Sequence, residues 1–326
     1  MRARLYDADG TDRDVDLTDD LTKDLSERRL LWVDVDRESG QDLESVAAAL
    51  HLEPALTARL ATSGKRPDLT KFEGHLHLAL LAMEPDAKDQ AGTDPGADAR
   101  THTIDVVGGK NWVLTVHDGR TAALDHFEAG TEGETHLGAL DAAGLVAAIA
   151  DEMLTGYLEI VEATERAIDR LDERALRGRA GDEVLEEIVR VRRRISGIRR
   201  ALAPQRAVFA ALTRPEMALD AEFGAPWPGL TDRLDRTIDA VENLRSLLLG
   251  TFDLHMARAA KDANDVMKVL TLVSAVFLPA VVLAGIMGMN FQLSFFDTPE
   301  NFFIVIAVMI GLAVALVAIA VKRDWV

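Results

Sequence analysis

A line of small and polar residues runs through an otherwise apolar stretch late in the sequence. Its positions alternate spacings of three and four, as one face of a helix in a bundle does. They are Asn264, Met267, Thr271, Ser274, Leu278, Val281, Gly285 and Gly288, followed by Met289 and Asn290. The spacing alone leaves two interpretations open: a close contact between helices, or a water-accessible lumen ringed by equivalent helices.

Two uncharged segments surround this line of residues. Residues 269–287 and 302–321 contain 19 and 20 residues without a charge. At 1.5 Å per residue, each helix would cover ~30 Å, the thickness of the hydrocarbon core of a bilayer. Buried helices of a soluble protein are the alternative, but two such spans joined by a short loop are rare in soluble cores. We therefore predict a two-span membrane domain over 266–326, with a first span at 267–288, an outer loop at 289–301, a second span at 302–321 and a tail.

Basic residues predict the orientation of these spans. Arg258, Lys261 and Lys268 come before the first span, and Lys322 and Arg323 follow the second. The loop between the spans has no basic residue. Because basic residues stay on the cytoplasmic side, both termini are expected in the cytoplasm and the loop outside. The sequence thus predicts a multi-pass protein of the cell membrane, with the lipid bilayer as a partner.

Composition excludes several other classes of protein. The chain has 326 residues, of which 36 are basic and 54 acidic, for a net charge of −18, and it contains no cysteine. Disulfides and thiolate metal sites are therefore absent, and nucleic acid is not an expected partner because it requires basic patches. The first 30 residues lack an apolar run, so no signal peptide is expected. No nucleophile motif, phosphate loop or ligand spacing of histidines appears, so we expect neither an enzyme nor a bound cofactor.

The first part of the sequence reads as strands with short helices. Residues 30–36, 75–83, 101–107 and 111–117 are rich in strand-forming residues. The last two would be joined by a hairpin turn at 108–110. Residues 84–100 and 118–136 have the composition of loops. We predict a cytoplasmic α/β domain over 1–136.

Helical periodicity dominates from residue 137. Helices are predicted at about 138–177 and 182–213, and a third runs from about 230 to the end of the first membrane span. A helix from 230 to 287 would be ~85 Å long, and such a helix needs partners in its own chain or in other subunits. The predicted stalk covers 137–265. The expected fold class is thus an α+β domain followed by long helices that lead into an all-α membrane domain with two spans.

Several segments resemble the CorA family of divalent-cation channels. The triplet Gly-Met-Asn at 288–290, after the first of two C-terminal spans, is the signature of that family. The resemblance is carried by "NDVMKVLT" (264–271), "FLPAVVLAGIMGMNF" (277–291) and "KRDW" (322–325), and further upstream by "GKRPDLTKFEGHLHLALL" (64–81), "GGKNWVLTVHDG" (108–119) and "RRRISGIRRALAPQR" (192–206). It covers most of the chain.

The resemblance implies a homopentameric funnel with five copies of the first span around a pore. Gly288, Met289 and Asn290 would form the outer selectivity ring. Since Mg²⁺ dehydrates reluctantly, the amide oxygens of Asn290 would bind the waters of the hydrated ion rather than the ion itself. Gly288 would expose its carbonyl group. Met289 would pack, because a thioether is too soft a ligand for Mg²⁺.

The resemblance also assigns roles deeper in the pore and at its mouths. Met267 with Leu270 or Thr271 would form a hydrophobic gate that closes by dewetting, and Asn264 would lie at the cytoplasmic mouth. The remaining pore-lining positions would be Ser274, Leu278, Val281 and Gly285. The acidic loop found in many family members is replaced here by "FQLSFFDTPEN" (291–301). Only Asp297 and Glu300 remain there to attract cations.

The function implied is influx of Mg²⁺, with Co²⁺ or Ni²⁺ as further ions, and Mg²⁺ is also the expected regulatory ion. The alternative within the same fold is a proton-coupled Zn²⁺ transporter like the ZntB branch. The spans offer no His or Cys ligand for a softer ion, which favours Mg²⁺. A third reading is a membrane scaffold that does not conduct. The sequence leaves open the preferred ion, proton coupling, the sensing carboxylates and the resting state.

Overall fold

The computed structural model describes the chain except for residues 19–20, 23–24, 27, 38–42, 63, 65, 85–99, 120, 132–136, 138–140, 178–181, 215–226, 290–298 and 324–326. The chain divides into two compact units. The first comprises Met1–Asp172 and Glu183–Thr251, and the second comprises Glu173–Asp182 and Phe252–Val326. Helix α8 contributes to both units.

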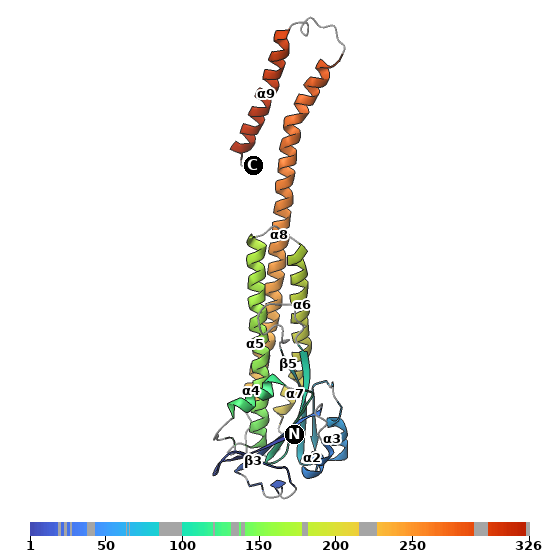
Figure 1. Ribbon diagram of the computed structural model, residues 1–326, viewed down its shortest axis with the longest axis vertical. Coiled ribbons are helices and arrows are strands. Elements are labelled where there is room, and N and C mark those ends of the chain that lie inside the picture. Colours follow the sequence, from blue (N-terminus) through green and yellow to red (C-terminus); the bar gives the residue numbers. More distant parts are fainter. Residues whose placement is uncertain are drawn as a thin grey trace. The chain divides into compact units, whose positions relative to one another are not determined.

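The first unit contains a seven-stranded sheet with the order β2-β1-β3-β7-β6-β5-β4 (Figure 1). Its strands are β1 (Arg2–Asp7), β2 (Arg13–Asp14), β3 (Arg29–Asp36), β4 (Asp68–Phe72), β5 (His75–Glu84), β6 (Arg100–Gly108) and β7 (Trp112–His117). Neighbouring strands pair antiparallel except for β3 and β7, which pair in parallel. A parallel pair requires a long crossover between its strands, and here helices α2 and α3 and the strands β4 to β6 lie between them in the sequence.

Helices cover both faces of this sheet, so its central strands are apolar on both sides. They are α2 (Leu43–Ala49), α3 (Pro54–Leu60), α4 (Ala122–Gly130), α5 (Ala142–Arg177), α6 (Asp182–Leu202) and α7 (Gln205–Leu212), with α8 (Trp227–Met287) following. Leu31 and Val33 of β3 pack with α2 and α3. Trp32 of the same strand belongs to the larger core formed with α4, α5, α6, α7 and α8.

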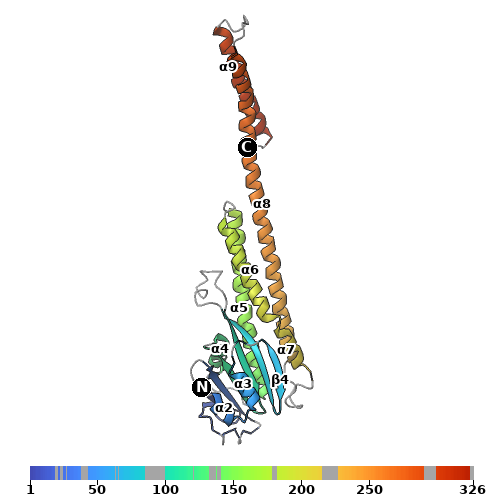
Figure 2. The same cartoon turned by 90° about the vertical axis from the view of Figure 1, so that its right-hand side faces the viewer.

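Polar anchors fix the long helices to the sheet. The hydroxyl of Tyr157 on α5 donates to the carbonyl oxygen of Leu81 on β5 at 2.8 Å. Gln205 of α7 donates to the same oxygen at 3.0 Å. Burial raises the pKa of Tyr157, although the hydrogen bond from Gln205 lowers it slightly, so this phenol is a neutral donor. Figures 1 and 2 show α5, α6 and the first part of α8 running side by side.

The predicted strands at 30–36, 75–83, 101–107 and 111–117 are confirmed. Two expectations are wrong. The helix predicted at 182–213 divides into α6 and α7, because Pro204 lacks the N–H group needed to continue a helix. The segment 118–136 contains helix α4 rather than only a loop. In addition, strands β1, β2 and β4 were not predicted. Of the predicted loop at 84–100, residues 85–99 lie outside the described residues.

The second unit contains the C-terminal part of α8 and helix α9 (Pro299–Lys322). The most apolar stretches of these helices have mean hydropathies of 2.5 and 3.2 and are long enough to cross a bilayer. Only 0% and 6% of their residues are buried by the rest of the chain. Pro279 lies inside α8, as membrane helices tolerate. The predicted fold class, an α+β domain followed by long helices and two apolar C-terminal helices, is confirmed.

Candidate functional site

The line of small and polar residues lies on α8 and just beyond it. Asn264 through Gly285 belong to the helix, which ends at Met287. Gly288 donates its N–H to the carbonyl oxygen of Ala284 at 3.0 Å, so the chain still follows the helix there. Asn290 and Asp297 lie outside the described residues.

This face of α8 has no cover from its own chain. Met267, Leu278 and Val281 are 64%, 69% and 64% exposed. The other positions, Asn264, Leu270, Thr271, Ser274, Gly285, Gly288 and Met289, are exposed as well. In a soluble protein such a stripe would cost free energy, because apolar area stays in water. We therefore expect either lipid or other subunits to cover this face of α8.

Other positions of α8 are less exposed than the predicted pore face. The half-buried residues of α8 include Leu272, Val276, Leu283 and Met287. On α9 a matching stripe consists of Val305, Met309, Ala313, Leu316 and Ala320. Both views show α9 beside the end of α8 (Figures 1 and 2). The half-buried stripe on α8 shares no position with the predicted pore face, which we call the open face of α8 because all its described residues are exposed.

The two glycines on the open face are not required by packing within the chain. A Cβ atom at Gly285 would meet no atom within 4 Å. A Cβ atom at Gly288 would meet only the carbonyl oxygens of Ala284 and Gly285, at 3.5 and 3.6 Å. These are ordinary contacts, so a larger side chain would fit both sites in a single chain. Close approach of another helix, or access to the backbone carbonyl groups, would explain the glycines.

Thr271 adds a polar group at the expected gate. Its hydroxyl donates to the carbonyl oxygen of Met267, one turn earlier, at 2.8 Å. Such a bond satisfies the hydroxyl's proton inside the helix. The lone pairs of the Thr271 oxygen remain available to accept hydrogen bonds from water.

Carboxylates before the first span are paired along the helix. Asp265 accepts from Lys268 at 3.0 Å, and this hydrogen bond lowers the pKa of Asp265. Asp262 lies 3.7 Å from Arg258. Paired charges attract mobile cations less than free carboxylates do. Glu300 is exposed in the first turn of α9, where a negative charge also stabilises the helix N-terminus.

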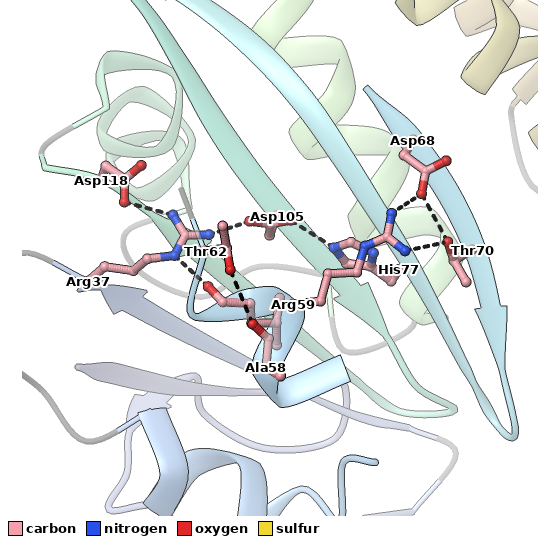
Figure 3. Close-up of polar contacts among 10 residues, drawn as sticks. Arg37, Ala58, Arg59, Thr62, Asp68, Thr70, His77, Asp105 and Asp118 are labelled. Carbon is pink, nitrogen blue, oxygen red and sulfur yellow. Dashed lines mark hydrogen bonds and ion pairs between the residues drawn. The ribbon is translucent and has the colours of Figure 1, made fainter. Parts of the chain in front are cut away.

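A buried charge network in the first unit was not predicted from the sequence (Figure 3). His77 on β5 contacts Asp105 on β6 at 2.7 Å, and both side chains are fully buried. Arg37 pairs with Asp105 and also with Asp118, at 2.8 Å. The alternation of polar and apolar residues at His75, Leu76 and His77 predicts a strand with one polar face, and it is the signal in the sequence for a buried polar side chain at His77. Among the residues that the structure describes, no three His, Asp or Glu side chains are grouped to hold a metal ion.

Comparison with known proteins places the chain in a family. Residues 27–323 match the family described as CorA-like Mg²⁺ transporter protein. The cobalt/magnesium transport protein CorA of Thermotoga maritima is 30% identical over 189 residues, which cover 56% of this chain and 52%, about half, of that relative.

Two solved structures share the fold. The complete structure of the CorA magnesium transporter from Methanocaldococcus jannaschii superimposes with a TM-score of 0.77 at 19% identity, covering 100% of this chain and 99% of that one. The cytoplasmic domain of ZntB from Vibrio parahaemolyticus gives a TM-score of 0.60 at 12% identity, covering 80% of this chain and 98% of that one. The match along most of the sequence, the shared fold and the two apolar C-terminal helices agree, and the chain belongs to the CorA family of divalent-cation transporters.

Proposed function

We propose that five copies of this chain form a channel that admits hydrated Mg²⁺, with Co²⁺ and Ni²⁺ as further ions. The observation that carries the proposal is the open face of α8, where small and polar residues stay exposed while other positions of the same helix are half-buried. A scaffold would have no reason to keep Asn264, Thr271 and Ser274 along one exposed line. Both termini would lie in the cytoplasm, as the basic residues predict.

Exposed apolar residues before the membrane span support self-assembly. Leu247, Leu249, Phe252 and Met256 are 46%, 56%, 36% and 48% exposed on α8. They precede the uncharged span, so lipid would not cover them. Large exposed apolar patches mark sites of association. Neighbouring copies of α8 would bury these side chains and would bring the open faces together around one axis.

In this proposal the ion moves without losing its inner waters. Five Asn290 amides would accept hydrogen bonds from those waters at the outer mouth, and neutral oxygens bind weakly enough for release. Gly288 would add carbonyl oxygens. Met267 and Leu270 would narrow the inner part of the pore and exclude water in the closed state. The inside-negative potential supplies ~2.3 kcal/mol per charge per 100 mV, about twice that for a divalent ion.

A proton-coupled Zn²⁺ transporter is the second candidate, because the fold is also similar to the cytoplasmic domain of ZntB. Ion flux into proteoliposomes distinguishes the two. We expect Mg²⁺ uptake that follows a potassium-set potential and ignores a pH gradient. Zn²⁺ uptake accelerated by a proton gradient would favour the transporter, and no flux of either ion would favour a scaffold.

Substitution of Asn290 tests the selectivity ring. Asn290→Ala removes the acceptors for the ion's waters and should abolish Mg²⁺ flux while the oligomer stays assembled. Asn290→Asp should bind Mg²⁺ more tightly and slow its release, because a carboxylate holds the ion more strongly. Asn243→Ala, an exposed position on α8 in the first unit, is the matched control. Normal Mg²⁺ flux through the Asn290→Ala variant would show that Asn290 does not form a selectivity ring.

Substitution of Met267 tests the gate. Met267→Ala shortens the side chain at the constriction, so the channel should leak at internal Mg²⁺ concentrations that close the unaltered protein. Val266→Ala changes the neighbouring exposed residue, which is off the open face, and should leave closure intact. Flux is measured at millimolar internal Mg²⁺. If both variants close normally, the gate lies elsewhere.

A further inference from the structure

Helix α6 carries a row of exposed arginines that the proposed pore does not use. We call it the arginine row, and it consists of Arg192, Arg193, Arg199 and Arg200. Each lies three or four residues from Ser196, so the four side chains share one face of the helix. Leu185 and Val189, each 40% exposed, continue this face toward the start of α6. Positive charge and exposed apolar area thus lie together in a chain whose net charge is −18.

Most of the arginine row is unpaired. Arg199, at its edge, pairs with Glu242 of α8 at 3.0 Å. In the part of the chain that the structure describes, the side chains of Arg192, Arg193 and Arg200 form neither an ion pair nor a hydrogen bond. A guanidinium group is always charged and matches the geometry of a carboxylate. These three groups are therefore available to carboxylates from outside the chain.

Helix α5, which precedes α6, carries an acidic row. It consists of Glu162, Glu165 and Asp169, which are exposed and spaced so that they share one face of the helix. Glu162 lies 3.7 Å from Arg166 on the same helix. Among the described residues, the side chains of Glu165 and Asp169 have neither an ion pair nor a hydrogen bond. The helix pair α5 and α6 thus presents two open rows of opposite charge.

The two rows do not pair with each other among the described residues of one chain. Helices α5 and α6 run side by side (Figures 1 and 2). They pack through buried residues of the larger core, such as Leu171 of α5 and Ile188 of α6. The charged rows lie on the exposed sides of both helices. A partner of the arginine row therefore has to come from another molecule.

The two rows also lie at the same height along the helix pair. Helix α5 ends at Arg177 and α6 begins at Asp182, and so short a connection joins antiparallel neighbours. At 1.5 Å per residue, the acidic row lies ~12–23 Å from the end of α5. The arginine row lies ~15–27 Å from the start of α6. The rows therefore overlap in height over most of their length.

Equal height is what a ring of identical copies requires. Rotation about an axis parallel to the helices moves a side chain around the axis but leaves its height unchanged. A residue on α5 of one copy can therefore meet only residues of similar height on the next copy. Two different surfaces that fit each other make a head-to-tail contact, and such contacts close a ring when the rotation closes.

We propose that the arginine row of one copy contacts the acidic row of the next copy in the oligomer. The inference rests on the proposed function only because it requires several copies around one axis. Leu185 and Val189 would be covered by the same contact, as expected of exposed apolar residues at a site of association. A nucleic acid is disfavoured as the partner, because the net charge of −18 would repel it.

Disulfide cross-linking of the full-length protein tests this contact, because the chain contains no cysteine of its own. Glu165→Cys and Ser196→Cys place one thiol near the middle of each row. When the two single variants are co-expressed, a disulfide-linked dimer should form, since the bond requires Cα atoms within ~7 Å. Either variant alone should give at least ~fivefold less dimer. Arg166→Cys with Ser196→Cys is the matched control, because Arg166 points ~100° away from Glu165 around the helix and should give no dimer.

Charge reversal tests whether the charges hold the contact. Arg193→Glu with Arg200→Glu, added to the Ser196→Cys chain, should lower the dimer yield ~fivefold or more, because like charges then meet. Glu162→Arg with Asp169→Arg, added to the Glu165→Cys chain, should restore the yield. Arg170→Glu with Arg190→Glu makes the same change in net charge at exposed positions outside both rows. That control should leave the yield unchanged.

The outcomes separate this contact from the channel. Thermal unfolding shows whether each variant is folded, and added salt lowers the yield without any charge reversal, because salt screens exposed charges. Equal yields from thiols on and off the rows, or a loss that the second reversal does not restore, would overturn the contact. Mg²⁺ flux without the dimer would refute the contact alone. The dimer without flux of any ion would refute the channel and leave the contact in place.

Discussion

Comparable apolar and charged residues are buried in the core of the first unit and exposed on the helices of the second unit. In the first unit Leu31 is 0% exposed, whereas Leu270 and Leu278 in the second are 65% and 69% exposed. Charged residues show the same difference in burial between the two units. Asp105 of the first unit is fully buried with its partners, while Asp265 and Lys268 of the second pair at the surface of one helix. The sheet core of the first unit is thus covered by its own chain, whereas the apolar helices of the second unit are not.

The largest effect is expected in the buried network of the first unit. Asp105→Ala would leave Arg37 and His77 without their shared carboxylate, and breaking a buried pair in this way costs about 3–5 kcal/mol. Asp68→Ala is the matched control. Asp68 pairs with Arg59 (Figure 3), and these side chains are 43% and 36% exposed, respectively. Exposed pairs contribute ~0–1 kcal/mol.

Unfolding followed by tryptophan fluorescence measures this difference, since Trp32 and Trp112 lie in the sheet. Asp105→Ala should unfold at a clearly lower temperature or denaturant concentration than Asp68→Ala. If the two variants lose the same amount of stability, the buried ion pair does not contribute more than the exposed one.

A smaller effect is expected where the second unit exposes apolar residues to lipid. Val308 is 56% exposed near the middle of α9, outside the half-buried stripe of that helix. Val308→Lys places a charge at the bilayer centre and should cost about 2.5–3.5 kcal/mol of insertion free energy. The fraction of protein retained in membranes after alkaline extraction reports this loss.

Leu185→Lys is the control for this prediction. Leu185 is also an exposed apolar residue, 40% accessible, but it lies on α6 in the first unit. Its substitution should leave membrane retention unchanged. If both lysine variants are lost from the membrane equally, exposure of apolar residues would have the same cause in both units.

Sequence patterns predicted the parts of the molecule that repeat a simple period. Uncharged runs gave both membrane helices, and alternating strand formers gave β3, β5, β6 and β7. Helix α4 was missed because its nine residues include Gly130 and lie in a polar segment, so its fold depends on packing of Leu124 and Phe127 on the sheet. Tertiary context overrides weak local preference in such cases.

The open face of α8 and the buried charge network also differ in how far the sequence alone could predict them. The open face of α8 could be read from spacing because a helix places residues three and four apart on one side. The network of Arg37, His77 and Asp105 joins residues 28 or more positions apart. No local pattern brings them together, since their contact follows from the sheet order. A single sequence therefore reveals sites on one element more readily than sites shared between strands.

The smallest effect concerns pH. Burial lowers the pKa of His117, but Asp34 and the Gly119 carbonyl group raise it more, so the folded value exceeds 6.5. A raised pKa means that the folded state binds the proton more tightly. The stabilisation is fully present below pH 6.5 and disappears as pH rises through the folded pKa. The gap in unfolding midpoint between the unaltered protein and His117→Gln should therefore narrow from about pH 5.5 to about pH 8.5.

The matching pair in the second unit should behave differently over the same range. The hydrogen bond from Lys268 lowers the pKa of Asp265 below 3.8. A lowered pKa gives stability that is lost only as pH falls through that acidic value, so nothing changes between about pH 5.5 and about pH 8.5. Asp265→Asn should shift the midpoint by the same small amount at every pH tested. A difference in unfolding midpoint that narrows with pH for Asp265→Asn, or that stays constant for His117→Gln, would contradict these predictions. The buried charge pair on the sheet and the exposed pair on the helix would then not differ in their pH dependence.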